Sequence, residues 1–239
     1  MVRAMQKMLN EVEFRISAKD LGELMSGSFC GRCFWIRRHF KVPYQRFPGI
    51  FSSIDAHTKK VVRNYVKEYH RLPKWDSFIG ALSLVEFKAS EFRFYDKETR
   101  SLLTGIPDEV FAKDDGSYVI VDYKTAKFTG AQDSLMPIYE VQLNAYAFIS
   151  ENIGYSPVHG IYLIYFEPPN AAESGEKATE SGLDMKFSAT MIRLGRNVDV
   201  LKLLRKAKEI FCGEMPAGRH GCSDCSSINA IASMLSHKD

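Results

Sequence analysis

The sequence has no long apolar run. No stretch of its 239 residues approaches the length of roughly 18 consecutive apolar residues that a membrane-spanning helix needs. The basic residues near the start are not followed by the apolar segment of a secretory signal. We therefore expect a cytoplasmic protein without membrane association. The net charge is also small, at +3, because 32 lysines and arginines are nearly balanced by 29 aspartates and glutamates. This balance excludes a strongly basic tail protein but leaves room for a local basic patch.

Cysteine is infrequent too, yet four of the five cysteines form two C-x-x-C pairs near opposite ends of the chain. Cys30 and Cys33 form the first pair, and Cys222 and Cys225 the second. Without an export signal, such pairs indicate metal or cluster ligands more than disulfides, which stay the alternative together with unligated thiols. Four thiolates suit tetrahedral zinc or a four-iron four-sulfur cluster, and the spacing does not decide. We expect Cys212, on an apolar helix, to be a packed thiol.

A basic and aromatic segment begins within the first cysteine pair and extends beyond it. Its members are Arg32, Phe34, Trp35, Arg37, Arg38, Phe40, Lys41, Tyr44, Arg46 and Phe47. One interpretation is an amphipathic helix with a solvated basic face. The other is a surface for phosphates and stacked bases.

The apolar pattern predicts one α/β domain in which helices cover a mixed sheet. Ser17 and Asp20 resemble a capping box, Ser52 or Ser53 is expected to cap the next long helix, and Gly154 to end a later one. Helices are predicted at about 18–25, 34–40, 53–70, 134–152 and 199–211, and strands at about 11–16, 81–95, 158–166 and 185–194.

The clearest local structure is a hairpin in which residues 101–111 and 117–125 flank the turn at 114–116. If Asp115 is the centre of the turn, Asp108 lies directly opposite Asp122, with the two Cβ atoms roughly 5 Å apart. Because side chains alternate along a strand, Lys124 shares a face with Asp122. The sequence thus places two carboxylates and one lysine together.

This arrangement has a chemical use. Two close carboxylates repel each other, and a divalent cation such as magnesium or manganese between them removes the repulsion. Lys124 can orient an attacking water and offset charge on a phosphate, which makes a phosphodiester hydrolysis site. The alternative is a surface hairpin in which aspartate and lysine simply pair. Charged residues on so apolar a strand are costly unless they serve a site, and this favours the first interpretation.

Three motifs around the hairpin resemble those of the RecB-type PD-(D/E)XK nucleases. That family carries G-x-x-D, then D-x-K in a hairpin, then Q-x-x-x-Y on a helix, and this chain has them at 105–108, 122–124 and 142–146. Gln142 and Tyr146 are four residues apart and share one helix face. The resemblance implies a restriction-endonuclease-like core, in which a mixed β-sheet is flanked by helices.

The resemblance also implies roles for individual residues. Asp108 and Asp122 are expected to hold a magnesium or manganese ion, and Lys124 to assist the attacking water. Gln142 and Tyr146 are expected to contact the substrate or the catalytic water.

One family position differs in this chain. RecB-type members carry a metal-binding histidine on an upstream helix, where this chain has Asp55. Aspartate is an equally suitable ligand for a hard cation. His57 is two residues further on and points to another side of the helix. We favour Asp55 as the third metal ligand, with His57 as the alternative.

The cysteines resemble those of the iron–sulfur subgroup, which comprises the CRISPR-associated RecB-like exonucleases and the AddB-type nuclease domain. That subgroup has one cysteine before the nuclease core and three after it. Here Ile231 stands where the last would be, so Cys33 is expected to supply the fourth ligand. The resemblance favours a four-iron four-sulfur cluster, with zinc as the alternative. A cysteine clasp from 26–40 and 212–230 then joins the N- and C-terminal segments of a single domain, 1–239, with its nuclease core at about 80–195.

The function that this resemblance implies is a DNA exonuclease acting on single-stranded or frayed ends, with proteins of a DNA-processing complex as candidate partners. The basic and aromatic segment is a candidate DNA-contact surface. A non-catalytic nucleic-acid-binding scaffold and an RNA-directed or sequence-specific endonuclease are the alternatives, because a shared fold does not determine the target.

Overall fold

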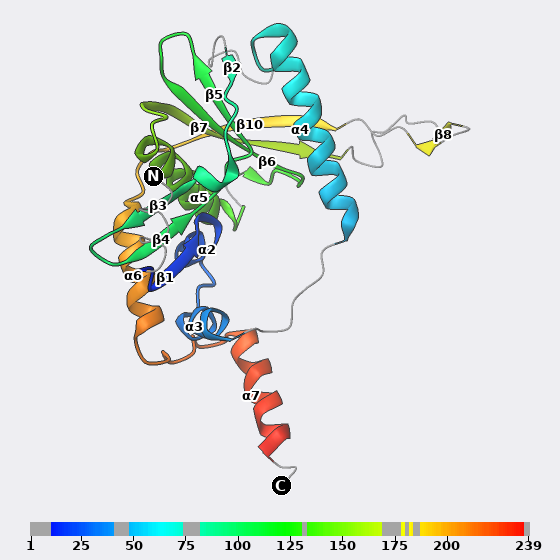
Figure 1. Cartoon of the computed structure of the whole chain (residues 1–239). Coiled ribbons are helices and arrows are strands. Elements are labelled where there is room, and N and C mark those ends of the chain that lie inside the picture. The colour runs from blue at the N-terminus through cyan, green and yellow to red at the C-terminus, as the bar shows by residue number, and fades with distance from the viewer. Residues whose placement is uncertain are drawn as a thin grey trace.

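A five-stranded mixed sheet lies at the centre of the molecule, in the order β10-β7-β6-β5-β2. Its strands are β2 (Leu82–Leu84), β5 (Glu109–Lys113), β6 (Tyr118–Lys124), β7 (Val158–Glu167) and β10 (Ser188–Leu194). The structure is a computed structural model, shown in Figure 1, and it describes residues 11–40, 48–73, 82–130, 133–168, 178–179, 182–183 and 187–236. The predicted loop at 168–182 and the start of the strand at 185–194 lie mostly outside these residues.

The hairpin of β5 and β6 has the register expected from its turn. Glu109 pairs with Val121, and Val110 pairs with Ile120. Gly116, in the turn, has a positive φ of 80°, a conformation that favours glycine. Next to it, β6 and β7 are parallel, and the helix α5 (Met136–Asn152) connects them. The hairpin and this crossover place β6 in the middle of the sheet.

The first arm of the predicted hairpin is divided between two sheets, so the prediction of one strand over 101–111 was wrong. Residues 101–104 form β4 (Ser101–Thr104) in a three-stranded sheet with β1 (Phe14–Ser17) and β3 (Arg93–Asp96). Pro107 has no backbone N–H and cannot donate to a ladder, while Gly105 donates its N–H to Phe92 O at 3.3 Å. The chain therefore leaves one sheet at Gly105 and enters the other at Glu109.

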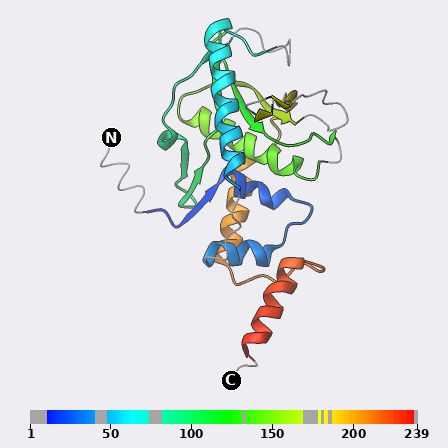
Figure 2. The ribbon, with the colours of Figure 1, turned by 90° about the vertical axis from the view of Figure 1, so that its right-hand side faces the viewer.

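Two helices cover opposite faces of the central sheet, as predicted. Ile120 belongs to the core shared with α5, whereas Val119 and Val121 belong to the core shared with α4 (Gly49–Tyr69). This alternation follows from the two-residue period of a strand. In Figures 1 and 2, α4 is the long helix that runs beside the sheet. The even-numbered side chains of β6 consequently face α5.

Some of the predicted helix caps are present in the structure, and one is not. The Oγ of Ser17 accepts a hydrogen bond from Asp20 N at 3.0 Å and caps α2 (Ala18–Gly22), which a 3-10 turn (Glu23–Met25) extends. The expected serine cap of α4 was wrong: the helix begins earlier, at Gly49, and its N-cap residue Pro48 makes no side-chain capping hydrogen bond. Gly154 follows α5 with a φ of +107°.

The remaining helices lie toward one end of the molecule. They are α3 (Gly31–His39), α6 (Val200–Cys212) and α7 (Ser223–Ser236). In Figure 2, α7 projects away from the rest of the chain. Cys212 is exposed at the end of α6, so the expectation of a packed thiol was wrong. No helix among the described residues is both long and apolar enough to cross a membrane.

Candidate active site and cysteine centre

Asp108 and Asp122 meet at the open end of the hairpin. Asp108 is one residue before β5, in line with the register that pairs its neighbour Glu109 with Val121. Tyr123 N donates a hydrogen bond to Asp108 Oδ2 at 2.7 Å. Asp122 is buried, with 3% of its surface exposed. Burial raises the pKa of Asp122 to about 6; Lys124 opposes this rise, and the charge of Asp108 adds to it.

Lys124 lies beside Asp122 on the face of β6 that α5 covers. Its Nζ forms an ion pair with Asp122 Oδ2 and lies 4.6 Å from the centre of the Tyr139 ring. A cation above an aromatic face is attracted to it, so Tyr139 helps to hold the ammonium group in place. Although it is ion-paired, the buried Asp122 Oδ2 makes no hydrogen bond of good geometry with any described residue.

Helix α4 brings Asp55 to the same place. Lys59 Nζ is 2.7 Å from Asp55 Oδ2 and 2.7 Å from Asp108 Oδ1, so one ammonium group bridges the two carboxylates. His57 is exposed and lines an apolar hollow with Val61 on another side of the helix. The structure thus brings Asp55 to Asp108 and leaves His57 elsewhere.

Gln142 and Tyr146 lie next to each other on α5, as their spacing predicts. Both are buried, and Gln142 Nε2 donates to the Tyr146 hydroxyl at 2.6 Å. Burial raises the pKa of Tyr146, and the charge of Asp122 raises it further. Gln142 Oε1 is buried and has no hydrogen-bond partner among the described residues. This free acceptor belongs to the helix that covers the site.

Sequence reasoning missed two groups beside the aspartates. Lys59 is one; its spacing of four residues from Asp55 on a helix is the signal that could have identified it. The other is Glu109, with 1% of its surface exposed, whose Oε1 lies 2.7 Å from Arg63 Nε. Burial raises the pKa of Glu109, although Arg63 opposes the rise. No local pattern marks this pair, because α4 and β5 are distant in sequence.

The donor set suits a divalent cation. Asp108, Asp122 and Asp55 offer carboxylate oxygens, the ligand type that magnesium and manganese prefer. Asp122 Oδ2 is buried without a good hydrogen bond, and a lysine ammonium group already bridges the other two carboxylates. Three carboxylates that already attract two ammonium groups form a site that fits a metal ion.

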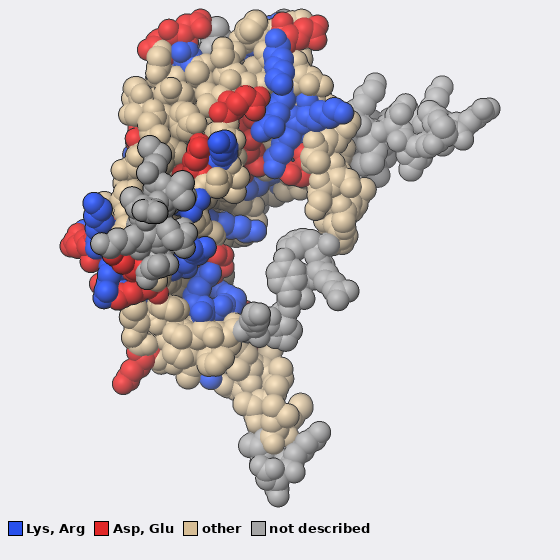
Figure 3. All heavy atoms as spheres, viewed as in Figure 1, with Lys and Arg blue, Asp and Glu red and all other residues tan. Residues whose placement is uncertain are grey.

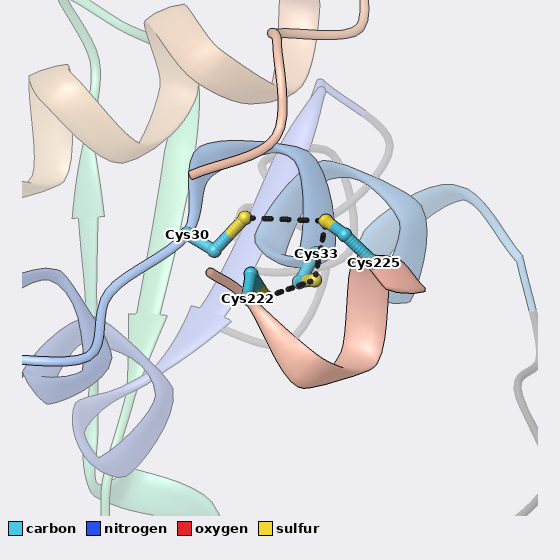
Figure 4. Close-up of side chains that lie close together, drawn as sticks. All are labelled: Cys30, Cys33, Cys222 and Cys225. Atoms are coloured by element: carbon cyan, nitrogen blue, oxygen red, sulfur yellow. Dashed lines mark hydrogen bonds between the residues drawn. The ribbon is translucent and has the colours of Figure 1, made fainter. Parts of the chain in front are cut away.

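The two cysteine pairs converge at the start of α3 and of α7, as Figure 4 shows. All four sulfur atoms lie within 4.8 Å of one another, and all four residues are buried. Burial raises the pKa of the Cys30 thiol, but hydrogen bonds from backbone N–H groups and neighbouring thiols outweigh it and lower the pKa to about 6. Burial and the neighbouring thiols raise the pKa of Cys33. Such a cluster of thiols from both chain ends can bind a metal.

Part of the basic and aromatic segment serves the fold. Phe34 is fully buried and is therefore unable to stack on a base. Arg38 lies over the Phe34 ring and pairs with Asp20 at 2.9 Å, while Arg37 pairs with Glu23 at 2.6 Å. Residues 41–47 lie outside the described residues.

A mixed sheet between helices, with a cluster of carboxylates and a lysine at its central strand, makes this an α/β protein with a site that could hold a divalent cation. Residues 5–230 match the model of the PD-(D/E)XK nuclease superfamily. The chain belongs to this superfamily, whose members are metal-dependent nucleases.

No curated protein matches the chain. Among solved structures, one described as "Crystal structure of SSO0001" is similar over 86% of this chain and 82% of that one, with 12% sequence identity and a TM-score of 0.40.

Proposed function

We propose that the protein is a metal-dependent deoxyribonuclease whose reaction takes place at Asp108, Asp122 and Lys124. The observation that carries this proposal is the buried Asp122, which is ion-paired with Lys124 on the central strand and lies beside Asp108. A carboxylate is costly to bury, and membership of a nuclease superfamily gives this one a use. Asp108 and Asp122 would hold the cation, with Asp55 as third ligand.

Each remaining residue has a role that follows from its position. A bound divalent cation supplies Lewis acidity toward a phosphate oxygen and the attacking water. Lys124, held by Asp122 and the Tyr139 ring, orients the water and offsets charge that develops on the phosphate. Gln142 Oε1 is free to accept a hydrogen bond from the water or the substrate, and Tyr146 fixes the Gln142 amide.

Basic residues near the site support a nucleic-acid substrate. Figure 3 shows Lys and Arg side chains over the upper part of α4 and again lower on the same face, with Asp and Glu side chains between them. A hollow of about 420 Å³ is lined by Arg15, Lys19 and Arg93 and also by Tyr146, so it borders the proposed site. Such cations can contact the phosphates that flank the cleaved bond. Action as an exonuclease on single-stranded or frayed DNA ends is proposed from the resemblance to RecB-type nucleases.

The cysteine centre and the cell compartment complete the proposal. We propose that residues 1–239 act as one nuclease domain, in which a cysteine clasp from 26–40 and 212–230 holds a structural metal centre outside a core at about 80–195. The resemblance to the iron–sulfur nucleases implies a four-iron four-sulfur cluster there, with zinc as the alternative. Cysteines that serve as metal ligands suit a reducing compartment, so the proposed location is the cytoplasm.

The test uses the hairpin's own matched controls. Lys113 and Asp115 form an ion pair of 2.9 Å at the turn, far along the hairpin from the site. Purified wild type is assayed with manganese or magnesium on end-labelled single- and double-stranded DNA, beside Lys124→Ala, Asp122→Asn, Lys113→Ala and Asp115→Asn. We expect the first two variants to lose about 10²-fold or more in rate. The two turn variants should keep wild-type rates.

The other outcomes separate the alternatives. Equal rates in all four variants would rule out the catalytic assignment. DNA binding without cleavage by the wild type indicates a scaffold. Cleavage of circular single-stranded DNA indicates an endonuclease, and faster cleavage of an RNA of the same sequence indicates an RNA-directed enzyme.

A metal titration decides between the two candidate third ligands. Asp55→Ala should raise the manganese concentration needed for half-maximal cleavage, because it removes a ligand next to Asp108. His57→Ala should leave this concentration unchanged. The opposite pattern would assign the ligand to His57.

A further inference from the structure

The four clustered thiols belong to two helix starts that are far apart in sequence. Cys30 immediately precedes α3 and Cys33 is in its first turn, while Cys222 and Cys225 have the same places in α7. Cys30 Sγ is 3.6 Å from Cys225 Sγ, and Cys33 Sγ is 3.6 Å from Cys222 Sγ. Cys33 Sγ and Cys225 Sγ are 3.4 Å apart. The sulfurs point toward one another (Figure 4).

The spacing of the sulfur atoms bears on the identity of the metal. Four thiolates around one zinc ion, with Zn–S bonds of about 2.3 Å, lie about 3.8 Å from one another in a regular tetrahedron. In a four-iron four-sulfur cluster each thiolate binds a different iron. The whole cluster then lies between the thiolates and holds them much further apart. The observed spacing, with no sulfur pair beyond 4.8 Å, matches a single ion.

The backbone around the sulfurs is also shaped for thiolates. Arg219 N donates a hydrogen bond to Cys30 Sγ at 3.3 Å, the kind of contact that orients a metal-bound ligand. At Gly218 an added Cβ would lie 3.0 Å from Cys225 Sγ, so glycine lets the chain approach this sulfur closely. Residues 218–219 therefore wrap around the cluster.

Helix α7 has few other means of attachment. Ile231, Met234 and Leu235 are 59%, 68% and 64% exposed, so the apolar side chains of its second half do not pack on the described residues. At its first half, Arg32 donates to Asn229 Oδ1 at 3.0 Å. Arg37 of α3 also pairs with Asp224 of α7 at 3.9 Å, but exposed polar contacts of this kind contribute little, and this leaves the cysteine centre as the main attachment.

We propose that Cys30, Cys33, Cys222 and Cys225 bind a single tetrahedral zinc ion, and that this ion fastens α7 to α3. The inference stands on the sulfur geometry and not on the proposed nuclease activity. It departs from the iron–sulfur cluster that the family resemblance implies.

Metal analysis of the full chain, purified without air, tests the proposal. We expect one zinc per chain, no iron and no acid-labile sulfide. The matched control compares two cysteine variants: Cys225→Ser should lose the zinc, whereas Cys212→Ser should keep it, because Cys212 is exposed and outside the cluster. Lys124→Ala should keep the zinc too, which separates this result from the nuclease test.

Contrary results are equally clear. Iron and acid-labile sulfide in equal amounts, with an absorption band at about 400 nm, would show an iron–sulfur cluster. Full zinc content in Cys225→Ser would place the ion elsewhere. If that variant does not fold, cobalt added to the metal-depleted wild type is the second measurement. Strong visible absorption typical of tetrahedral cobalt thiolate is expected, and its absence overturns the proposal.

The fastening of α7 has its own measurement. Hydrogen exchange in wild type is followed before and after zinc is removed by a chelator. We expect the amides of α7 to lose protection while those of β6 keep theirs. Unchanged exchange in α7 would contradict the anchoring role.

Discussion

Gly105→Ala is the substitution whose effect the structure defines most sharply. A Cβ on Gly105 would lie 2.7 Å from Tyr146 Cε1 and 2.8 Å from Ala18 Cβ, distances that real contacts do not reach. Both neighbours are buried, at 6% and 0% exposure, so neither can move without disturbing the core. Overpacking of this kind costs about 1–3 kcal/mol. In a chain of this length that lowers the melting temperature by about 2–4 °C per kcal/mol.

The assay compares Gly105→Ala with Gly27→Ala, at a glycine whose added Cβ meets nothing within 4 Å. Thermal unfolding should show the loss in Gly105→Ala alone. DNA cleavage at a temperature where both variants are folded should also be slower in Gly105→Ala, because the displaced Tyr146 holds the Gln142 amide. Equal melting temperatures would refute the packing argument. Equal cleavage rates despite lower stability would refute the positioning role of Tyr146.

Two further predictions concern buried carboxylates. In protein freed of divalent cations, burial raises the pKa of Asp122 from 3.8 to about 6. The folded state then binds more protons than the unfolded chain, so the free energy of unfolding falls as pH rises from about 4 to about 6. Asp122→Asn should abolish this fall when stability is measured by urea titration at several pH values. A variant with the pH profile of the wild type would contradict the prediction. Arg63→Met leaves the buried Glu109 without its ion pair and should cost about 1–3 kcal/mol. As the control, Arg205→Met breaks the exposed ion pair with Glu98 and should cost less than about 1 kcal/mol in the same denaturant assay. Equal losses of stability in Arg63→Met and Arg205→Met would count against a special cost of the buried Glu109.

The sequence was most informative where structure is local. The turn at 114–116 and the two-residue alternation of β6 predicted the register that places Asp108 opposite Asp122, and the pairing of Glu109 with Val121 agrees. The four-residue spacing of Gln142 and Tyr146 predicted their contact on α5. Ser17 capped α2 as its pattern indicated. Each of these depends on residues a few positions apart.

Predictions from the sequence were wrong where contacts with other parts of the structure outweighed the local pattern. The strand expected over 101–111 is divided, because β4 pairs with β1 and β3 while β5 pairs with β6. The start of α4 follows Pro48, although serine caps were available a few residues later. Cys212 lies on a helix that is apolar on one side only, and this residue falls on the exposed side.

By itself, the sequence determined the hairpin, its facing carboxylates and the lysine beside them, because turn chemistry and strand alternation act over a few residues. Only the tertiary structure decided that Lys59 bridges Asp55 and Asp108, while His57 lies on another side of α4. It also decided how closely four thiols from opposite ends of the chain approach. These features depend on how distant segments pack, and no local pattern records the distance between them.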